Sequence, residues 1–189
     1  MKCDCRATSL GLVAWKRFQD AANDGEKGFG QIARKAGVYC IRVSRVGETR
    51  PSEIVKKYQQ SPLYNALKSL VRSSDEFFES YGFGKGWGWT WYATDVDKDL
   101  SKIESISTNE RGDLDCPILY IGCSRSLPKR VYEMMYLAHV VNHPLWALLC
   151  SEWNLEIASR SAQDYKEEER RLKDAYRAVH GRLPPLMVE

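Results

Sequence analysis

Apolar positions along the chain alternate between a helical spacing and short uninterrupted runs. The spacing over residues 9–22 predicts a short amphipathic helix. The β-branched, apolar run over residues 37–43 predicts a strand. Tyr39, Ile41 and Val43 should share one face of that strand, because side chains alternate along extended backbone.

A second strand-forming segment lies over residues 117–130. Its apolar beginning predicts a buried strand, and Gly122 permits the chain to turn where a larger residue would be strained. Ser126 then occupies an N-cap position and Pro128 the first turn of a helix, where a missing N–H costs little. Arg130 follows in that first turn, so it should be held close to the end of the strand.

The last third of the chain also combines predicted helices with a predicted strand. Residues 142–144 (Asn-His-Pro) predict a helix break, and the apolar residues after them begin another short helix. Residues 153–158 alternate as a third strand. A long amphipathic helix follows over residues 163–180, and Gly181 ends it. The mixture of strands and separate helices predicts an α+β fold with a small sheet.

Residues 44–116 form an excursion between the two strand segments. Its first part predicts a helix beginning at residues 61–62, and residues 89–92 predict a strand. The stretch from 81 to 92 alternates glycines with aromatic residues and includes Lys85 and Trp87. Its aromatic side chains either pack the core of the excursion or form a platform for stacked bases. Packing is the commoner role of such a cluster, and both alternatives remain open.

Three consecutive carboxylates, Glu167, Glu168 and Glu169, lie on the predicted last helix. At about 100° per residue, Glu167 points away from the apolar stripe of that helix, whereas Glu168 and Glu169 flank it. At least one carboxylate therefore borders the buried face. The alternative is an ordinary solvated ion pair, for example between Glu169 and Lys173.

Composition limits the class of protein without choosing its function. The chain has 189 residues, 43% of them hydrophobic and 28% charged, as expected for one globular domain, with or without a large insertion. Its net charge of +3 is only weak support for a polyanionic partner. The six cysteines form no CxxC pair, and no signal-peptide or membrane-spanning pattern occurs. We therefore expect a cytoplasmic protein with reduced thiols and no membrane partner.

Taken together, the motifs resemble those of the GIY-YIG nuclease domain. Residues 37–39 (Gly-Val-Tyr) correspond to the first motif and residues 120–122 (Tyr-Ile-Gly) to the second. The family places its catalytic arginine ten residues after the start of the second motif, where Arg130 stands. Its catalytic glutamate lies in the pattern Glu-x-x-Leu-x-x-x-Tyr, which Glu169 begins.

The resemblance implies a small three-stranded, mostly antiparallel sheet flanked by helices. Residues 1–36 would form an N-terminal helical extension. The GIY-YIG-like domain would span residues 37–187, interrupted by the insertion 44–116 with its helix and aromatic stretch.

The resemblance also implies a metal-dependent endonuclease that hydrolyses phosphodiester bonds in DNA. Glu169 would hold Mg²⁺ or Mn²⁺, and Arg130 would bind the non-bridging phosphate oxygens. Tyr39 or Tyr120 would orient or deprotonate the attacking water. The partner would be nucleic acid, with a homodimer left open. The residues expected to contact nucleic acid are Arg125, Lys129, Lys85 and Trp87.

Two alternatives come from other functional classes. The chain carries Cys123 and Met134 where many family members have Lys or His, and Met187 where the family often has Asn. These departures favour a nucleic-acid-binding module without cleavage. A protein-interaction domain that docks a partner on the aromatic stretch is the third possibility. His139 and His143 are four residues apart, as in some metal sites, but the predicted break at Pro144 makes ordinary structural roles the better interpretation.

Overall fold

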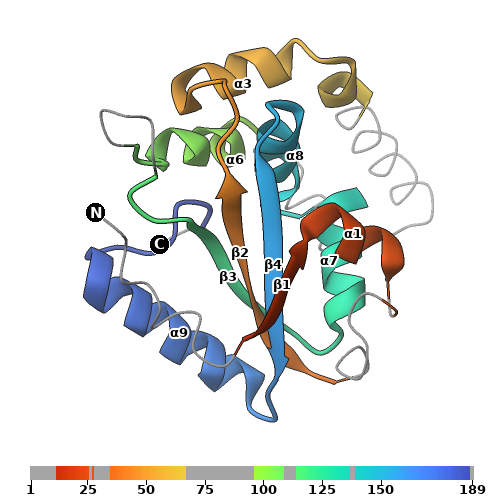
Figure 1. Ribbon diagram of the computed structural model, residues 1–189, viewed down its shortest axis with the longest axis vertical. Coiled ribbons are helices and arrows are strands. Elements are labelled where there is room, and N and C mark those ends of the chain that lie inside the picture. The colour runs from red at the N-terminus through yellow and green to blue at the C-terminus, as the bar shows by residue number, and fades with distance from the viewer. Residues whose placement is uncertain are drawn as a thin grey trace, which may run out of the picture.

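The protein has an α+β fold built on an antiparallel sheet (Figure 1). The computed structural model describes residues 12–25, 27, 35–66, 96–108, 114–136 and 139–187. The strands in these residues follow the spatial order β1-β4-β2-β3. They are β1 (Val13–Arg17), β2 (Gly37–Arg45), β3 (Ile118–Ser124) and β4 (Asn154–Ser161).

The two motif strands are neighbours in the sheet. β2 pairs with β3 in antiparallel register, with Tyr39 opposite Gly122 and Ile41 opposite Tyr120. β4 pairs with the other edge of β2. β3 is thus an edge strand of the described sheet, and it carries the second motif.

The expectation of three strands was wrong, because β1 adds a fourth by pairing with β4. The same segment corrects the helix predicted over residues 9–22. Within it, Val13–Arg17 is a strand, and the helix α1 covers only Phe18–Asp24. Antiparallel pairing with a distant strand supplies the hydrogen bonds that a helix would otherwise make locally.

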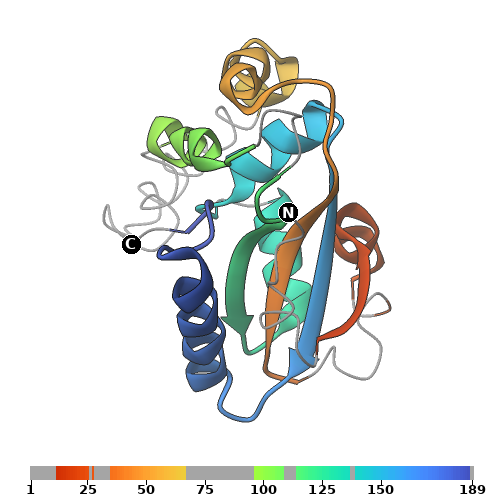
Figure 2. The same cartoon turned by 60° about the vertical axis from the view of Figure 1, so that its left-hand side comes forward.

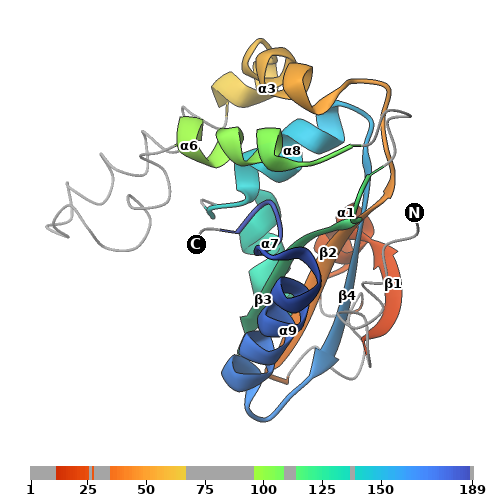
Figure 3. The same cartoon turned by 90° about the vertical axis from the view of Figure 1, so that its left-hand side faces the viewer.

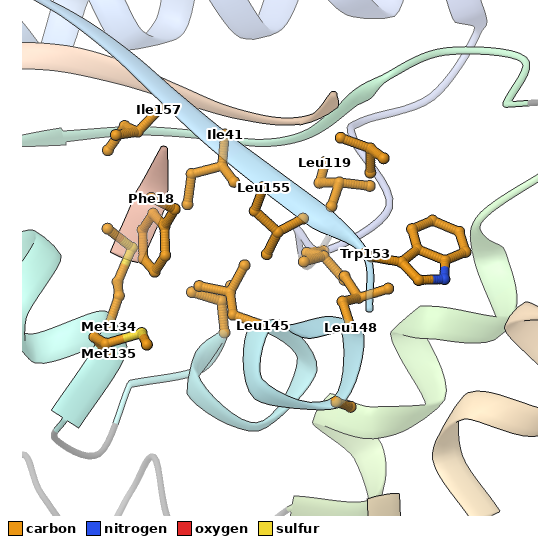
Figure 4. Close-up of a cluster of buried hydrophobic side chains, with 14 of the residues drawn as sticks. Phe18, Ile41, Leu119, Met134, Met135, Leu145, Leu148, Trp153, Leu155 and Ile157 are labelled. Carbon is orange, nitrogen blue, oxygen red and sulfur yellow. The ribbon is translucent and has the colours of Figure 1, made fainter. Parts of the chain in front are cut away.

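Helices cover both faces of the sheet (Figure 2). The first face buries Tyr39, Ile41 and Val43 in the larger core together with apolar residues of α1 and of the helices α7 (Leu127–Tyr136) and α8 (Asn142–Cys150). Figure 4 shows part of this core, with Leu145 and Leu148 of α8 facing Leu155 of β4. The opposite face buries Val38 and Cys40 under α9 (Tyr165–His180). The two-residue alternation predicted for β2 is confirmed.

α9 also confirms the predicted long helix and its ends. Asp164 caps it, its side chain accepting a hydrogen bond from the Glu167 N–H at 3.2 Å. Gly181 ends it in the left-handed conformation, with φ of 70°, which glycine adopts without strain. Leu172 and Tyr176 are the buried residues of this helix, and they fix which of its sides faces β2 and β3.

The predicted break between two helices is present, but its position at residues 142–144 was wrong, since α8 begins at Asn142. Pro144 lies in the first turn of α8, where a residue has no intrahelical partner for its N–H, so proline is tolerated. The Asn142 side chain donates to the carbonyl oxygens of Met134 and Met135 at the end of α7. The break between the helices therefore falls before Asn142.

The excursion is helical in its described part and shares the main core. Its elements there are α3 (Pro51–Gln59), a helical turn over residues 62–66, α6 (Val96–Ser101) and the short 3₁₀ helix η3 (Lys102–Ser105). Ile54, Leu100 and Ile103 join the same buried cluster as the sheet residues. Figure 3 shows α3 and α6 beside α8, at the end of the sheet where β2 ends. The strand predicted over residues 89–92 lies outside the described residues.

Within the described ranges, no helix combines the length and the apolar character needed to cross a membrane.

Candidate active site at the edge of the sheet

The two motif tyrosines lie side by side on β2 and β3. Their ring centroids are 6.0 Å apart and their planes differ by 27°, a stacked arrangement. Gly122 makes this possible, because a Cβ atom at that position would lie 2.5 Å from the Tyr39 hydroxyl oxygen and 2.8 Å from Cε1 of Tyr120. The glycine of the second motif thus provides the space that the tyrosine of the first motif occupies.

The two hydroxyl groups are hydrogen-bonded to each other. Burial, the neighbouring Tyr120 and Glu169 raise the pKa of Tyr39 well above its ordinary value, against the lowering effect of Arg130. Burial and Glu169 raise the pKa of Tyr120 to about 12, although Arg130 and the Tyr39 hydrogen bond lower it. Both phenols are therefore neutral at physiological pH, which suits them to orient a water molecule better than to remove its proton.

Arg130, on α7, lies near enough to act electrostatically on both tyrosines. This helix starts directly beyond β3, after a turn in which the Ser124 hydroxyl accepts the Ser126 N–H at 3.0 Å. Leu127 and Val131 are fully buried and anchor the first turns of α7, whereas the Arg130 side chain remains 34% exposed. Its Nη1 lies 3.0 Å from Oε2 of Glu133, one helical turn further on. Glu133 thus holds the guanidinium in place while the remaining N–H groups can serve another acceptor.

Glu169 comes from the other side of the sheet, on α9. Its side chain is 20% exposed, so it stands at the border of the buried face, as its helical position predicted. The Cys123 thiol donates to Glu169 Oε2 at 2.8 Å, and Lys173 Nζ lies 2.7 Å from Oε1. The i,i+4 ion pair that was the alternative interpretation of Glu169 is also present. The two interpretations are compatible, because the Glu169 carboxylate lies at the border of the buried face and also forms the ion pair with Lys173.

The four predicted residues therefore converge on the β3 edge. Arg130 and Glu169 each act electrostatically on both Tyr39 and Tyr120. α7 packs in the core on one face of the sheet and α9 in the core on the other, so Arg130 and Glu169 approach the tyrosine pair from opposite faces. A cation, a carboxylate and two neutral phenols, brought together from four elements, can bind an anion that also carries a metal ion.

Cys123 and Lys173 contact the candidate site but were not predicted as parts of it. Cys123 lies on β3 three residues after Tyr120, and burial with its hydrogen bond to Glu169 raises the pKa of its thiol to about 12. It is thus a hydrogen-bond donor rather than a thiolate. The four-residue spacing on the helix predicted the contact between Glu169 and Lys173. No local sequence pattern predicted the contact between Cys123 and Glu169. Met134, which stands where family members have a polar residue, is fully buried in the core (Figure 4).

His139 and His143 contact different neighbours. The His139 ring packs edge-on against Tyr120 at 6.3 Å, and burial and Arg130 lower the pKa of His139 to about 3. The His143 ring nitrogen Nδ1 instead lies 3.1 Å from the Tyr58 hydroxyl in the core. Among the described residues, no cluster of three or more His, Cys, Asp or Glu side chains could hold a metal ion.

Two of the four predicted nucleic-acid contacts lie on the surface next to the site. Arg125, in the turn before α7, donates from Nε to the Tyr165 hydroxyl at 3.0 Å. Lys129 is 77% exposed on the first turn of α7 and lies 3.9 Å from Glu133. Lys85 and Trp87 lie outside the described residues.

Comparisons with known proteins found no match to this chain among family models, curated proteins or solved structures.

Proposed function

We propose that the chain is a metal-dependent endonuclease that hydrolyses phosphodiester bonds in DNA, with a GIY-YIG-like site. The observation that carries the proposal is the convergence of Tyr39, Tyr120, Arg130 and Glu169. These residues come from β2, β3, α7 and α9, and the last two approach from opposite faces of the sheet. Core packing alone does not require a partly exposed arginine and a partly exposed carboxylate near two hydrogen-bonded tyrosines.

The tyrosine pair would position the attacking water. The Tyr39 hydroxyl is buried and hydrogen-bonded to the Tyr120 hydroxyl, which would hold the Tyr120 hydroxyl in a fixed position. Tyr120 is the more exposed of the two, so its hydroxyl is the one that substrate or water can reach. Fixing the orientation of the nucleophile lowers the barrier by removing orientational freedom before the reaction.

Arg130 would bind the non-bridging oxygens of the phosphate. A guanidinium presents its N–H donors in a planar fork that matches two phosphate oxygens. The ion pair with Glu133 uses Nη1 and fixes the direction of the side chain. Charge that develops on the phosphate in the transition state would then meet a preorganised cation.

Glu169 is the residue that would hold the metal ion. Mg²⁺ binds through one or two carboxylates and keeps most of its waters, so a single carboxylate suits it. The Glu169 oxygens have about four lone-pair positions, of which Cys123 and Lys173 use two, so room for a cation remains. When bound, Mg²⁺ or Mn²⁺ would supply charge neutralisation at the phosphate and the leaving oxygen.

A nucleic-acid-binding module without cleavage is the second candidate. One observation favours it, namely that each Glu169 oxygen has a protein partner and one of those partners is a cation. Under this alternative, Lys173 would permanently take the place of the metal ion, and Arg130, Arg125 and Lys129 would still bind phosphates.

The experiment that tests the function is incubation of the purified protein with mixed DNA and RNA substrates, with and without Mg²⁺ or Mn²⁺. The proposal expects cleavage of DNA that requires the metal ion and is lost in the Glu169→Gln variant. Salt-sensitive binding with no cleavage in either ion would favour the second candidate. Cleavage that survives in Glu169→Gln would remove that carboxylate from the mechanism.

A further inference from the structure

Lys173 lies beside the candidate metal ligand but has no role in the proposed reaction. It follows Glu169 by one turn of α9, and its ammonium lies 2.7 Å from Glu169 Oε1. The other oxygen of the same carboxylate accepts from Cys123 at 2.8 Å. Both oxygens of the candidate metal ligand are thus engaged by side chains of the protein itself.

The two partners differ in what a metal ion would do to them. The Cys123 thiol is neutral, and a hydrogen bond to one lone pair of Oε2 is compatible with a cation on another. Lys173 carries a full positive charge within contact distance of the carboxylate, where a divalent cation would be repelled by it. Its side chain is 30% exposed and its four-carbon stem is flexible, so the ammonium can turn away from Oε1 toward water.

We propose that Lys173 is a displaceable counterion for Glu169 that sets the metal affinity of the site. Without a metal ion, Lys173 neutralises the mostly buried carboxylate and, together with Cys123, holds it toward β3. Binding of a divalent cation requires the ammonium to leave Oε1, and this exchange weakens the affinity for the metal. The inference rests on the proposed function, because it takes Glu169 to be the metal ligand.

The neighbouring ion pairs on α9 indicate that this arrangement is specific to Glu169. Glu167 pairs with Arg170 on the exposed side of the helix, and Glu168 pairs with Arg160 of β4. Of these three glutamates, Glu169 is the one whose charge acts on the pKa values of Tyr39 and Tyr120. Lys173 is thus the α9 cation paired with the candidate metal ligand, and Arg170, paired with Glu167, is a matched control on the same helix.

The test is titration of the purified protein with Mn²⁺ in the absence of nucleic acid, with free Mn²⁺ measured by electron paramagnetic resonance. Lys173→Met removes the charge and keeps the length of the side chain, and we expect its Mn²⁺ affinity to rise roughly tenfold. Lys173→Arg keeps the charge and should stay within about twofold of the wild type. Arg170→Met, which loses the same charge beside Glu167, should also stay within that range.

The Glu169→Gln variant separates the two ways in which the inference can fail. Loss of Mn²⁺ binding in Glu169→Gln, with unchanged or weaker binding in Lys173→Met, overturns the counterion role and leaves Glu169 as the metal ligand. Equal binding in Glu169→Gln and the wild type, or no binding in any variant, overturns the metal assignment and the inference with it. Binding in Lys173→Met but not in the wild type is the strongest support.

Discussion

The Tyr39 hydroxyl group occupies the space where a side chain at Gly122 would begin. The two residues are opposite each other in the β2–β3 ladder, and a Cβ atom at position 122 would lie 2.5 Å from the Tyr39 oxygen. The tyrosine of one motif and the glycine of the other are therefore a single packing unit. Tyr39 can stack on Tyr120 as it does only because position 122 has no side chain.

The first prediction follows from that contact. Gly122→Ala should destabilise the fold by about 1–3 kcal/mol, because the added methyl group forces Tyr39 and Tyr120 to move within a packed interior. Urea unfolding measures this cost. In a double-mutant cycle with Tyr39→Leu, which removes the contacting atoms, the two effects should be less than additive. Full additivity would show that the contact does not limit stability.

Arg130→Ala and Glu169→Gln should each reduce metal-dependent cleavage by roughly a hundredfold or more, since each residue is aimed at charge in the transition state. Both side chains are partly exposed, so thermal unfolding should change little. Single-turnover cleavage rates give the measurement. Arg177→Ala removes an exposed cation paired with Asp174 near the end of α9 and is the control that should retain full activity. Near-normal rates in either site variant would exclude that residue.

The hydroxyl pair gives a third prediction. Tyr120→Phe removes the hydrogen-bond partner of the buried Tyr39 hydroxyl, which should cost about 1–3 kcal/mol of stability and also slow cleavage. Tyr39→Phe leaves the Tyr120 hydroxyl in place at the accessible position and should retain more of the activity. Comparison of cleavage rates with unfolding free energies for both variants is the test. Equal activity in the two variants would contradict the assignment of Tyr120 as the outward hydroxyl.

Buried His139 predicts a dependence of stability on acidity. Burial and Arg130 lower its pKa from 6.5 to about 3, so below pH 6.5 the unfolded chain binds a proton that the folded chain does not. Stability should therefore fall as the pH decreases from about 6.5 toward 3, with this residue contributing up to about 1.4 kcal/mol per pH unit. Urea unfolding between pH 7 and 5 measures the slope. His139→Gln should flatten it, whereas the partly exposed His180→Gln should change it less. An unchanged slope in His139→Gln would contradict the prediction.

Arg125 and Lys129 should contribute to nucleic-acid affinity through phosphates. Alanine substitution of either should weaken binding about equally for different sequences and lower the salt slope by about one. Fluorescence anisotropy at several salt concentrations tests this, again with Arg177→Ala as the control. If affinity falls while the salt slope stays constant, the lost contact is not electrostatic and the assignment fails.

The sequence by itself determined the elements that carry the candidate site. The apolar alternation of β2 defined which side chains face each core, and Gly181 defined the end of α9. The helical period also put Glu169 at the border of the buried face and Lys173 within its reach. These properties depend on near neighbours along the chain, because side-chain periodicity and capping are local.

Tertiary structure alone decided which segments meet. β1 is a strand because β4, about 140 residues later, supplies its hydrogen-bond partners, and its five residues had no local pattern that would distinguish them from a helix. Cys123 contacts Glu169 only because α9 packs across β3. His139 lies before α8 and its ring packs against Tyr120, whereas His143 lies inside α8, which begins at Asn142. Contacts between residues far apart in the chain depend on how elements pack, and that information is spread over the whole core.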